Sequence, residues 1–292
     1  MSKLWLFVRE VYAPGLHVAF TAAWFLSLVV LLGAPVDARA LHLVALGVVV
    51  LFYLRAVDEW KDEDYDRIHN PDRPLVRGAV TRDDVLRYVA GAAALSLALA
   101  WPLGLAATAI VAADLAWAVL LVFLERRSAL VRDGMFVNLV LTYPVNVALS
   151  VLVLVVETTH GGVAFSGRGG LAVAAFACAF LHFEILRKTA WPAAATPGER
   201  LYSQVIGPVP SAALATVLAL AAVLLLAFLV DAPARPSRLL LVLATTMVPL
   251  AAFRRFVDRG RTAPQARLRL RPWGMAFLSL FYLATIASRF LG

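Results

Sequence analysis

Three aspartates recur at every fourth position in the segment Asp58-Glu-Trp-Lys-Asp-Glu-Asp-Tyr-Asp66. On a helix this spacing places Asp58, Asp62 and Asp66 along one face, where their charges repel unless a cation lies between them. The segment contains no histidine or cysteine, and hard carboxylate oxygens favour Mg²⁺ over zinc or a calcium cage. The spacing therefore indicates a magnesium site. The alternative is an acidic helix end in water, balanced by Lys61 and Arg67 in surface ion pairs.

Two arginines follow shortly downstream, in the segment Asn70-Pro-Asp-Arg-Pro-Leu-Val-Arg-Gly78. The planar guanidinium groups of Arg73 and Arg77 suit bidentate contacts to diphosphate oxygens. A divalent metal and arginines together can stabilise a departing diphosphate. The acidic and basic stretches therefore predict chemistry on a diphosphate.

The combined segment resembles the first motif of the UbiA-type superfamily of intramembrane aromatic prenyltransferases, which includes the 4-hydroxybenzoate polyprenyltransferases. That motif reads N-D-x-x-D-x-x-x-D and continues N-P-x-R-P-L-x-x-G, whereas this chain reads D-E-x-x-D-x-x-x-D and N-P-D-R-P-L-V-R-G. Asp58 takes the place of the asparagine and Glu59 that of the first aspartate, while Asp62 and Asp66 match. The resemblance implies nine transmembrane helices in an all-α bundle around a central cavity, with the first motif after the second span.

The same resemblance implies a transferase of alkyl groups other than methyl. It would move an isoprenyl group from an isoprenyl diphosphate donor to an aromatic or lipid-like acceptor, with Mg²⁺ as cofactor and release of diphosphate. A terpene cyclase of the same fold is a close variant, because the substrate's own double bond could capture the allylic cation. A non-catalytic transporter or lipid-binding protein is the other alternative.

The family's second acidic motif, D-x-x-x-D at the end of the sixth span, is altered here. The corresponding stretch is His182-Phe-Glu-Ile-Leu-Arg-Lys188. Glu184 can replace the first aspartate, but Lys188 cannot replace the second. We hypothesise that Glu184 binds metal while Arg187 or Lys188 contacts the diphosphate. The alternative is an ion pair between Glu184 and Lys188, one helical turn apart.

Other polar side chains lie within the apolar runs. Asn138, Thr142 and Asn146 form a stripe beside Tyr143, where they could orient an acceptor or join helices, and Pro144 predicts a kink. Asp114 should face protein or a cavity, since lipid would not solvate it. The residues expected to act in catalysis are Asp58, Asp62, Asp66, Glu184 and Lys188, and all of these except Lys188 are expected metal ligands. The residues expected to bind substrate are Arg73, Arg77, Arg187, Asn70, Lys61, Asn138, Tyr143, Asn146 and Tyr202.

The composition shows which elements must position these residues. Of 292 residues, 62% are hydrophobic and 16% are charged, which is typical of a chain whose main solvent is lipid. Because apolar runs recur throughout and no long soluble stretch separates them, we expect one membrane domain over residues 1–292. Nine runs are predicted to be helices: 16–32, 41–57, 85–102, 103–124, 135–156, 171–186, 211–230, 239–253 and 274–291.

The basic residues give the expected orientation. In the nine-span order, most of the 27 lysines and arginines fall in loops on one side, which places the N-terminus and the acidic motifs on the cytoplasmic side, in the cell (inner) membrane. These loops lie beside the membrane, where anionic lipid headgroups attract them. The net charge of +8 therefore predicts contact with membrane lipids and no nucleic-acid partner.

Overall fold

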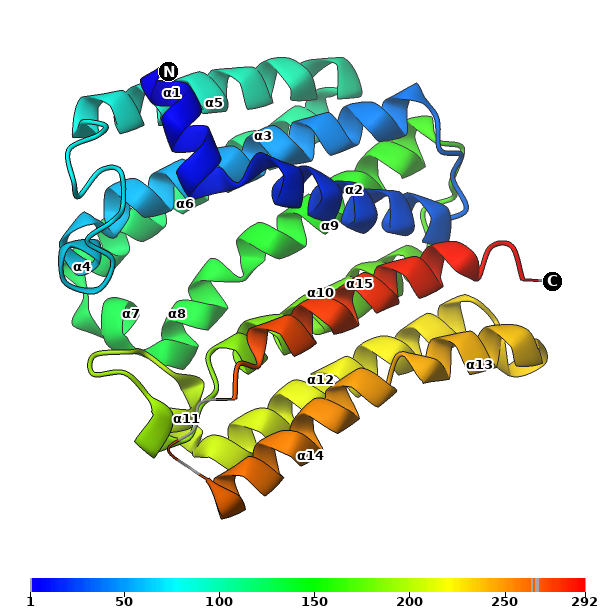
Figure 1. The fold of residues 1–292 in the computed structure, drawn as a ribbon. Coiled ribbons are helices and arrows are strands. Elements are labelled where there is room, and N and C mark those ends of the chain that lie inside the picture. Colours follow the sequence, from blue (N-terminus) through cyan, green and yellow to red (C-terminus); the bar gives the residue numbers. More distant parts are fainter. Residues whose placement is uncertain (1, 264, 266–267, 292) are drawn as a thin grey trace. The chain divides into compact units, whose positions relative to one another are not determined.

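The computed structural model describes residues 2–263, 265 and 268–291, and in these ranges the chain forms helices and no strand (Figure 1). Within the described ranges, eight helical segments are long and apolar enough to cross a membrane. A helix satisfies its backbone polar groups internally, which lipid requires. The protein is an integral membrane protein, and the predicted all-α fold class is confirmed.

Most spans are continuous helices that match an apolar run to within a few residues. They are α2 Pro14–Leu31, α3 Ala38–Lys61, α5 Arg82–Ala100, α6 Leu105–Arg127, α10 Gly167–Arg187, α12 Pro208–Leu229 and α15 Arg271–Ala287. The ninth expected span corresponds to α15, whose 17 residues extend over about 25 Å, short of a hydrocarbon core of roughly 30 Å. The count of nine spans is therefore approximate.

Two spans are broken helices. The fifth consists of α8 Met135–Thr142 and α9 Pro144–His160, with the break at Tyr143. Proline lacks a backbone donor and its ring crowds the preceding turn, so the kink predicted at Pro144 is confirmed. The eighth consists of α13 Pro236–Ala244 and α14 Met247–Thr262. Its break was not predicted, and the hydroxyls of Thr245 and Thr246 bond there to carbonyls three residues earlier.

Contacts group the chain into two compact units, which we describe separately. The first comprises Met1–Leu26, Pro35–Arg132 and Leu141–Gly161; the second comprises Ser27–Ala34, Asp133–Val140 and Gly162–Gly292. In the first unit α3 packs on α5 and α6, and α6 packs on α9. In the second unit α10 packs on α12 and α15, and α14 packs on the same two helices. A single domain over 1–292 stays a prediction.

Short helices complete the chain. They are α1 Lys3–Phe7, followed by a π-helical turn Val8–Tyr12, α4 Glu63–His69, α7 Ala129–Asp133 and α11 Tyr202–Ile206. In the first unit the loop 70–81 is fixed by a buried cluster, in which Leu75 and Val80 pack with Phe7, Val11 and Ala56. The loop that carries the arginines is thus anchored to the core by its apolar residues.

Candidate functional site

The acidic segment lies where α3 ends. Asp62 is the C-cap of α3, with φ −92° and ψ 10°, and α4 begins at the next residue. Backbone hydrogen bonds keep the four-residue register, from Asp62 N to Asp58 O at 2.9 Å and from Asp66 N to Asp62 O at 2.8 Å. The three aspartates therefore keep their spacing but do not share one unbroken helix, which corrects the sequence prediction. Carboxylates near a helix C-terminus oppose its dipole and repel one another, so a break there is favoured.

The three aspartates differ in exposure. The side chains of Asp58 and Asp62 are 51% and 44% exposed, whereas that of Asp66 is 8% exposed. Two carboxylates thus face accessible space, and the third is enclosed by protein.

One lysine joins the accessible carboxylates. Lys61 Nζ lies 3.9 Å from Asp58 Oδ1, 3.7 Å from Asp62 Oδ1 and 3.1 Å from Glu125 Oε2 at the end of α6. We call Asp58, Lys61, Asp62 and Glu125 the Lys61 cluster. It holds three carboxylates against one ammonium group, and Arg55 Nη1 also lies 4.0 Å from Asp58 Oδ2, so negative charge remains in excess. The contacts to Asp58 and Asp62 are longer than hydrogen bonds.

This crowding changes the titration of Asp62. Burial is the largest cause that raises the pKa of the Asp62 carboxyl to about 6; Lys61 opposes the rise, and nearby Asp58, Glu125 and Asp66 add to it. A cation placed beside the carboxylates would relieve both their repulsion and the loss of water. The Lys61 cluster is therefore a place where a divalent ion would be stabilised.

The enclosed carboxylates share an arginine. Arg73 Nη1 lies 3.4 Å from Glu59 Oε2, and Arg73 Nε lies 3.8 Å from Asp66 Oδ2. Arg55 Nη2 lies 3.2 Å from the same Glu59 oxygen, and Asn70 Nδ2 donates to Asp66 Oδ1 at 2.6 Å. We call Arg55, Glu59, Asp66, Asn70 and Arg73 the Arg73 cluster. Glu59 is 2% exposed, and its Oε1 has no hydrogen-bond partner in the described ranges.

Arg77 pairs with a carboxylate outside both clusters, that of Glu10. Its Nη2 donates to Glu10 Oε2 at 2.7 Å and its Nη1 to the carbonyl of Asp72 at 3.3 Å. Arg77 therefore joins the N-terminal segment to the loop, and its expected contact to diphosphate stays a prediction. Gly78, with φ +74°, closes the turn that follows, a conformation that glycine adopts readily.

Trp60 keeps two further arginines in place beside the acidic segment. The guanidinium carbons of Arg126 and Arg82 lie 4.8 and 5.8 Å from the Trp60 ring centroid. Cation–π contacts of this kind hold Arg126 on the indole, although it is the neighbour of Glu125 in sequence.

In the second unit, Glu184 is already paired with cations. Arg187 Nε and Nη2 both lie 2.6 Å from Glu184 Oε2, and Lys188 Nζ lies 3.0 Å from Oε1. The ion-pair alternative for Lys188 is thus present in the structure. Tyr202 is buried beside it: its backbone N–H donates to the Lys188 carbonyl at 3.0 Å, and Lys188 Nζ lies 5.8 Å from its ring. Burial raises the pKa of the Tyr202 hydroxyl, and Glu184 adds to the rise.

The polar residues of the fifth span are partly buried. Asn138 belongs to the second unit, and Thr142, Tyr143 and Asn146 belong to the first. Their role toward an acceptor stays a prediction. Asp114 is 5% exposed, so it faces protein as expected.

Sequence reasoning missed two carboxylates. The spacing of the acidic motif does not point to Glu125, and only its place at the end of an apolar run hints at a buried partner. Glu59 was recognised as the counterpart of a motif aspartate but was given no role. Its alignment with that aspartate was the available signal.

The donor atoms suit Mg²⁺, because the clusters offer only carboxylate and amide oxygens. Within the described ranges, no three carboxylate, imidazole or thiol groups converge closely enough to form a complete metal site. Instead, Lys61 and Arg73 lie between the carboxylates. A metal would therefore take over contacts that these two basic side chains now make.

No family model and no curated protein matches the chain. Two solved structures do. One, described as giving insights into the biosynthesis of digeranylgeranylglyceryl phosphate synthase in membranes, is 15% identical with a TM-score of 0.69, over 99% of each chain. The other, a UbiA homolog from Archaeoglobus fulgidus bound to GPP and Mg²⁺, is 15% identical with a TM-score of 0.57, over 98% of this chain and 100% of that one. The chain therefore has the UbiA-type membrane fold, and the resemblance seen at 58–78 is confirmed at the level of the fold.

Proposed function

We propose that the protein is a Mg²⁺-dependent intramembrane prenyltransferase, which moves an isoprenyl group from an isoprenyl diphosphate to an aromatic or lipid-like acceptor. The observation that carries this proposal is the pairing of the Lys61 and Arg73 clusters at the end of α3, in a segment that reads D-E-x-x-D-x-x-x-D and N-P-D-R-P-L. The UbiA-type fold supports it, as does the binding of GPP and Mg²⁺ by a protein of that fold.

Asp58, Asp62 and Asp66 are the proposed metal ligands in the first unit, and Glu184 is the proposed ligand in the second. When bound, Mg²⁺ would act as a Lewis acid on the diphosphate oxygens. The excess negative charge of the Lys61 cluster and the raised pKa of Asp62 support a divalent cation there.

The chain's basic residues bind the diphosphate in this proposal. Arg73 is oriented by Glu59 and Asp66, so its guanidinium is fixed before substrate arrives. The ammonium group of Lys61 moves from a carboxylate to a diphosphate oxygen. Lys188 and Arg187 neutralise part of the diphosphate charge directly, in place of a second metal ion. The allylic C–O bond breaks with both electrons going to diphosphate. The acceptor then forms a bond to the allylic cation and gives up a proton to the released diphosphate, while the apolar helices exclude water.

We place the acidic motifs on the cytoplasmic side of the cell (inner) membrane, in contact with lipid headgroups. The excess of lysine and arginine in loops on that side supports this orientation. With α15 as the ninth span, a reporter fused after the C-terminus would be found outside the cytoplasm.

Product analysis by the purified, lipid-reconstituted protein tests the function. Isoprenyl diphosphates of several chain lengths are offered with a panel of acceptors and Mg²⁺, and products and diphosphate are measured by mass spectrometry. Asp62→Asn and Asp66→Asn should abolish product, whereas Asp64→Asn, an exposed acid in α4 outside both clusters, should not. Full activity in the first two variants would refute the proposal.

The same panel separates the alternatives. Diphosphate release without an acceptor would indicate a terpene cyclase. The ion pairs of Glu184 with Arg187 and Lys188 favour a second candidate, a lipid-binding protein or transporter that kept the fold without turnover. Mg²⁺-dependent binding of donor with no product from any acceptor would support that candidate.

A further inference from the structure

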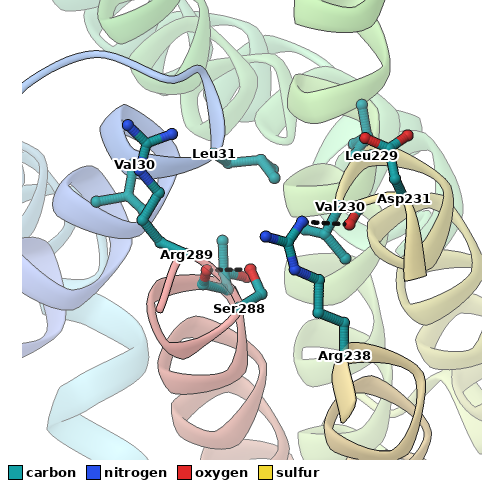
Figure 2. Close-up of a pocket in the computed structure, with 9 residues that line it drawn as sticks. Val30, Leu31, Leu229, Val230, Asp231, Arg238, Ser288 and Arg289 are labelled. Atoms are coloured by element: carbon teal, nitrogen blue, oxygen red, sulfur yellow. Dashed lines mark hydrogen bonds between the residues drawn. The ribbon is translucent and has the colours of Figure 1, made fainter. Parts of the chain in front are cut away.

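A polar cavity of about 180 Å³ lies in the second unit, where α2 and α12 end, α13 begins and α15 ends (Figure 2). All its lining residues belong to this unit. They are Val30, Leu31, Leu229, Val230, Asp231, Arg238, Thr285, Ser288 and Arg289. Two arginines and one aspartate thus line a single small cavity.

Arg238 is held in a fixed orientation. Its Nε donates to the carbonyl of Leu291 at 2.8 Å and its Nη1 to the carbonyl of Val230 at 2.9 Å. Figure 2 shows the guanidinium between Ser288 and Val230, at the centre of the group of lining residues. A guanidinium has five N–H donors, so these two bonds leave donors that can serve a ligand. Carbonyls do not neutralise its charge.

The other charges leave the cavity positive. Asp231 Oδ1 lies 3.7 Å from Arg168 Nη2, whose guanidinium also donates to the Leu229 carbonyl at 2.7 Å. Arg289 lines the cavity on the other side of Ser288 and forms no ion pair with any described residue. Among the described residues, Asp231 pairs with Arg168, and neither Arg238 nor Arg289 forms an ion pair.

The volume of the cavity and its lining residues indicate which kind of anion it can bind. The volume is below the roughly 300 to 1,000 Å³ of sites that enclose drug-sized molecules, so a small charged group suits it better than an isoprenoid chain. Val30, Leu31 and Leu229 give it apolar edges at the ends of membrane helices. Arginines with free donors are suited to bidentate binding of phosphate oxygens.

We propose that this cavity is a phosphate-binding site, which takes the phosphate of an anionic lipid headgroup or a free phosphate group. It is separate from the acidic end of α10: Arg168, beside the cavity, is at the start of this helix, and Glu184 is near its end, about 24 Å away along the helix. The inference does not rest on the proposed function.

Ligand-dependent thermal unfolding of the full chain in a non-ionic detergent tests the site. EDTA is present and Mg²⁺ absent, so that metal at the acidic segment does not contribute. The probes are dihexanoyl phosphatidic acid, inorganic phosphate, and dihexanoylglycerol, which has the same chains without phosphate. Phosphatidic acid should raise the midpoint of unfolding with concentration.

The variants locate the binding. Arg289→Gln should weaken the apparent affinity about tenfold by removing a charge-assisted contact. Arg238→Gln should weaken it at least as much, and Arg238→Lys should recover part of the affinity because the charge returns without the planar fork. The matched control is Arg235→Gln, an exposed arginine close in sequence that does not line the cavity, and it should bind like the unaltered protein.

Each outcome has a meaning. A response to phosphatidic acid alone identifies a lipid headgroup as the source, and an equal response to inorganic phosphate identifies the free anion. An equal response to dihexanoylglycerol, no response to either phosphate probe, or unchanged affinity in Arg289→Gln would overturn the proposal. Arg289 makes no described side-chain bond, so this variant decides the question even if Arg238→Gln fails to fold.

Discussion

The acidic end of α3 and the acidic end of α10 have opposite charge balances. In the Lys61 cluster, one ammonium group faces three carboxylates. At Glu184, one carboxylate faces the guanidinium of Arg187 and the ammonium of Lys188. In the first region carboxylates outnumber the basic groups that contact them, so a divalent ion can balance the charge, whereas the second region already has an excess of basic groups. The two regions would therefore neutralise a bound phosphate group by different means, one through a metal ion and the other through basic side chains.

Chelation of Mg²⁺ is expected to have the largest effect. If the Lys61 cluster needs a divalent ion, EDTA should lower prenyl transfer at least about 100-fold, and added Mg²⁺ should restore it. The measurement is the initial rate of diphosphate release against free Mg²⁺. An unchanged rate would mean that basic side chains neutralise the diphosphate without a metal ion in both regions, and the proposed difference between the ends of α3 and α10 would be wrong.

Removal of Arg73 should be the next largest effect. Arg73→Gln leaves Glu59 buried with only Arg55 as a partner, so the free energy of unfolding should fall by about 2 to 4 kcal/mol. Arg67→Gln is the control, because the Arg67 side chain is 60% exposed in its pair with Glu63 and should cost less than about 0.5 kcal/mol. Denaturant titration in mixed micelles measures both. Equal costs would show that Glu59 gains little from Arg73.

A variant of Lys188 tests the region at the end of α10. Lys188→Met should weaken the apparent affinity for isoprenyl diphosphate about tenfold and leave the Mg²⁺ dependence unchanged, because a direct contact is lost but no metal ligand is. Lys188→Arg should retain most of the affinity. Donor titrations at fixed Mg²⁺ measure this. An unaltered affinity in Lys188→Met would restrict the lysine to its pair with Glu184.

Glu125 should have the smallest effect. Glu125→Gln removes one of the three carboxylates around Lys61, so the Mg²⁺ concentration for half-maximal rate should rise about threefold to tenfold. Glu63→Gln alters a carboxylate that pairs with Arg67 outside the cluster and should leave that concentration unchanged. A shift of equal size in both variants would reflect general surface charge.

Local patterns predicted most of the fold. Apolar runs located the spans, and Pro144 located a break, because both signals act within a few residues. The break between α13 and α14 was not predicted. Two threonines whose hydroxyls bond to backbone carbonyls cannot be distinguished, from sequence alone, from other residues of an apolar run. In the site, the spacing of Asp58, Asp62 and Asp66 was sufficient to find the segment. It could not show that Lys61 reaches Glu125, which is distant in sequence and is brought near by the packing of α3 on α6.

The anchoring of the arginine loop makes the first dozen residues part of the candidate site's support. Phe7 and Val11 lie under Leu75 and Val80, and Glu10 holds Arg77. A tag, fusion or truncation at the first dozen residues would thus loosen the loop, and we expect it to weaken binding of an isoprenyl diphosphate even with every acidic residue intact.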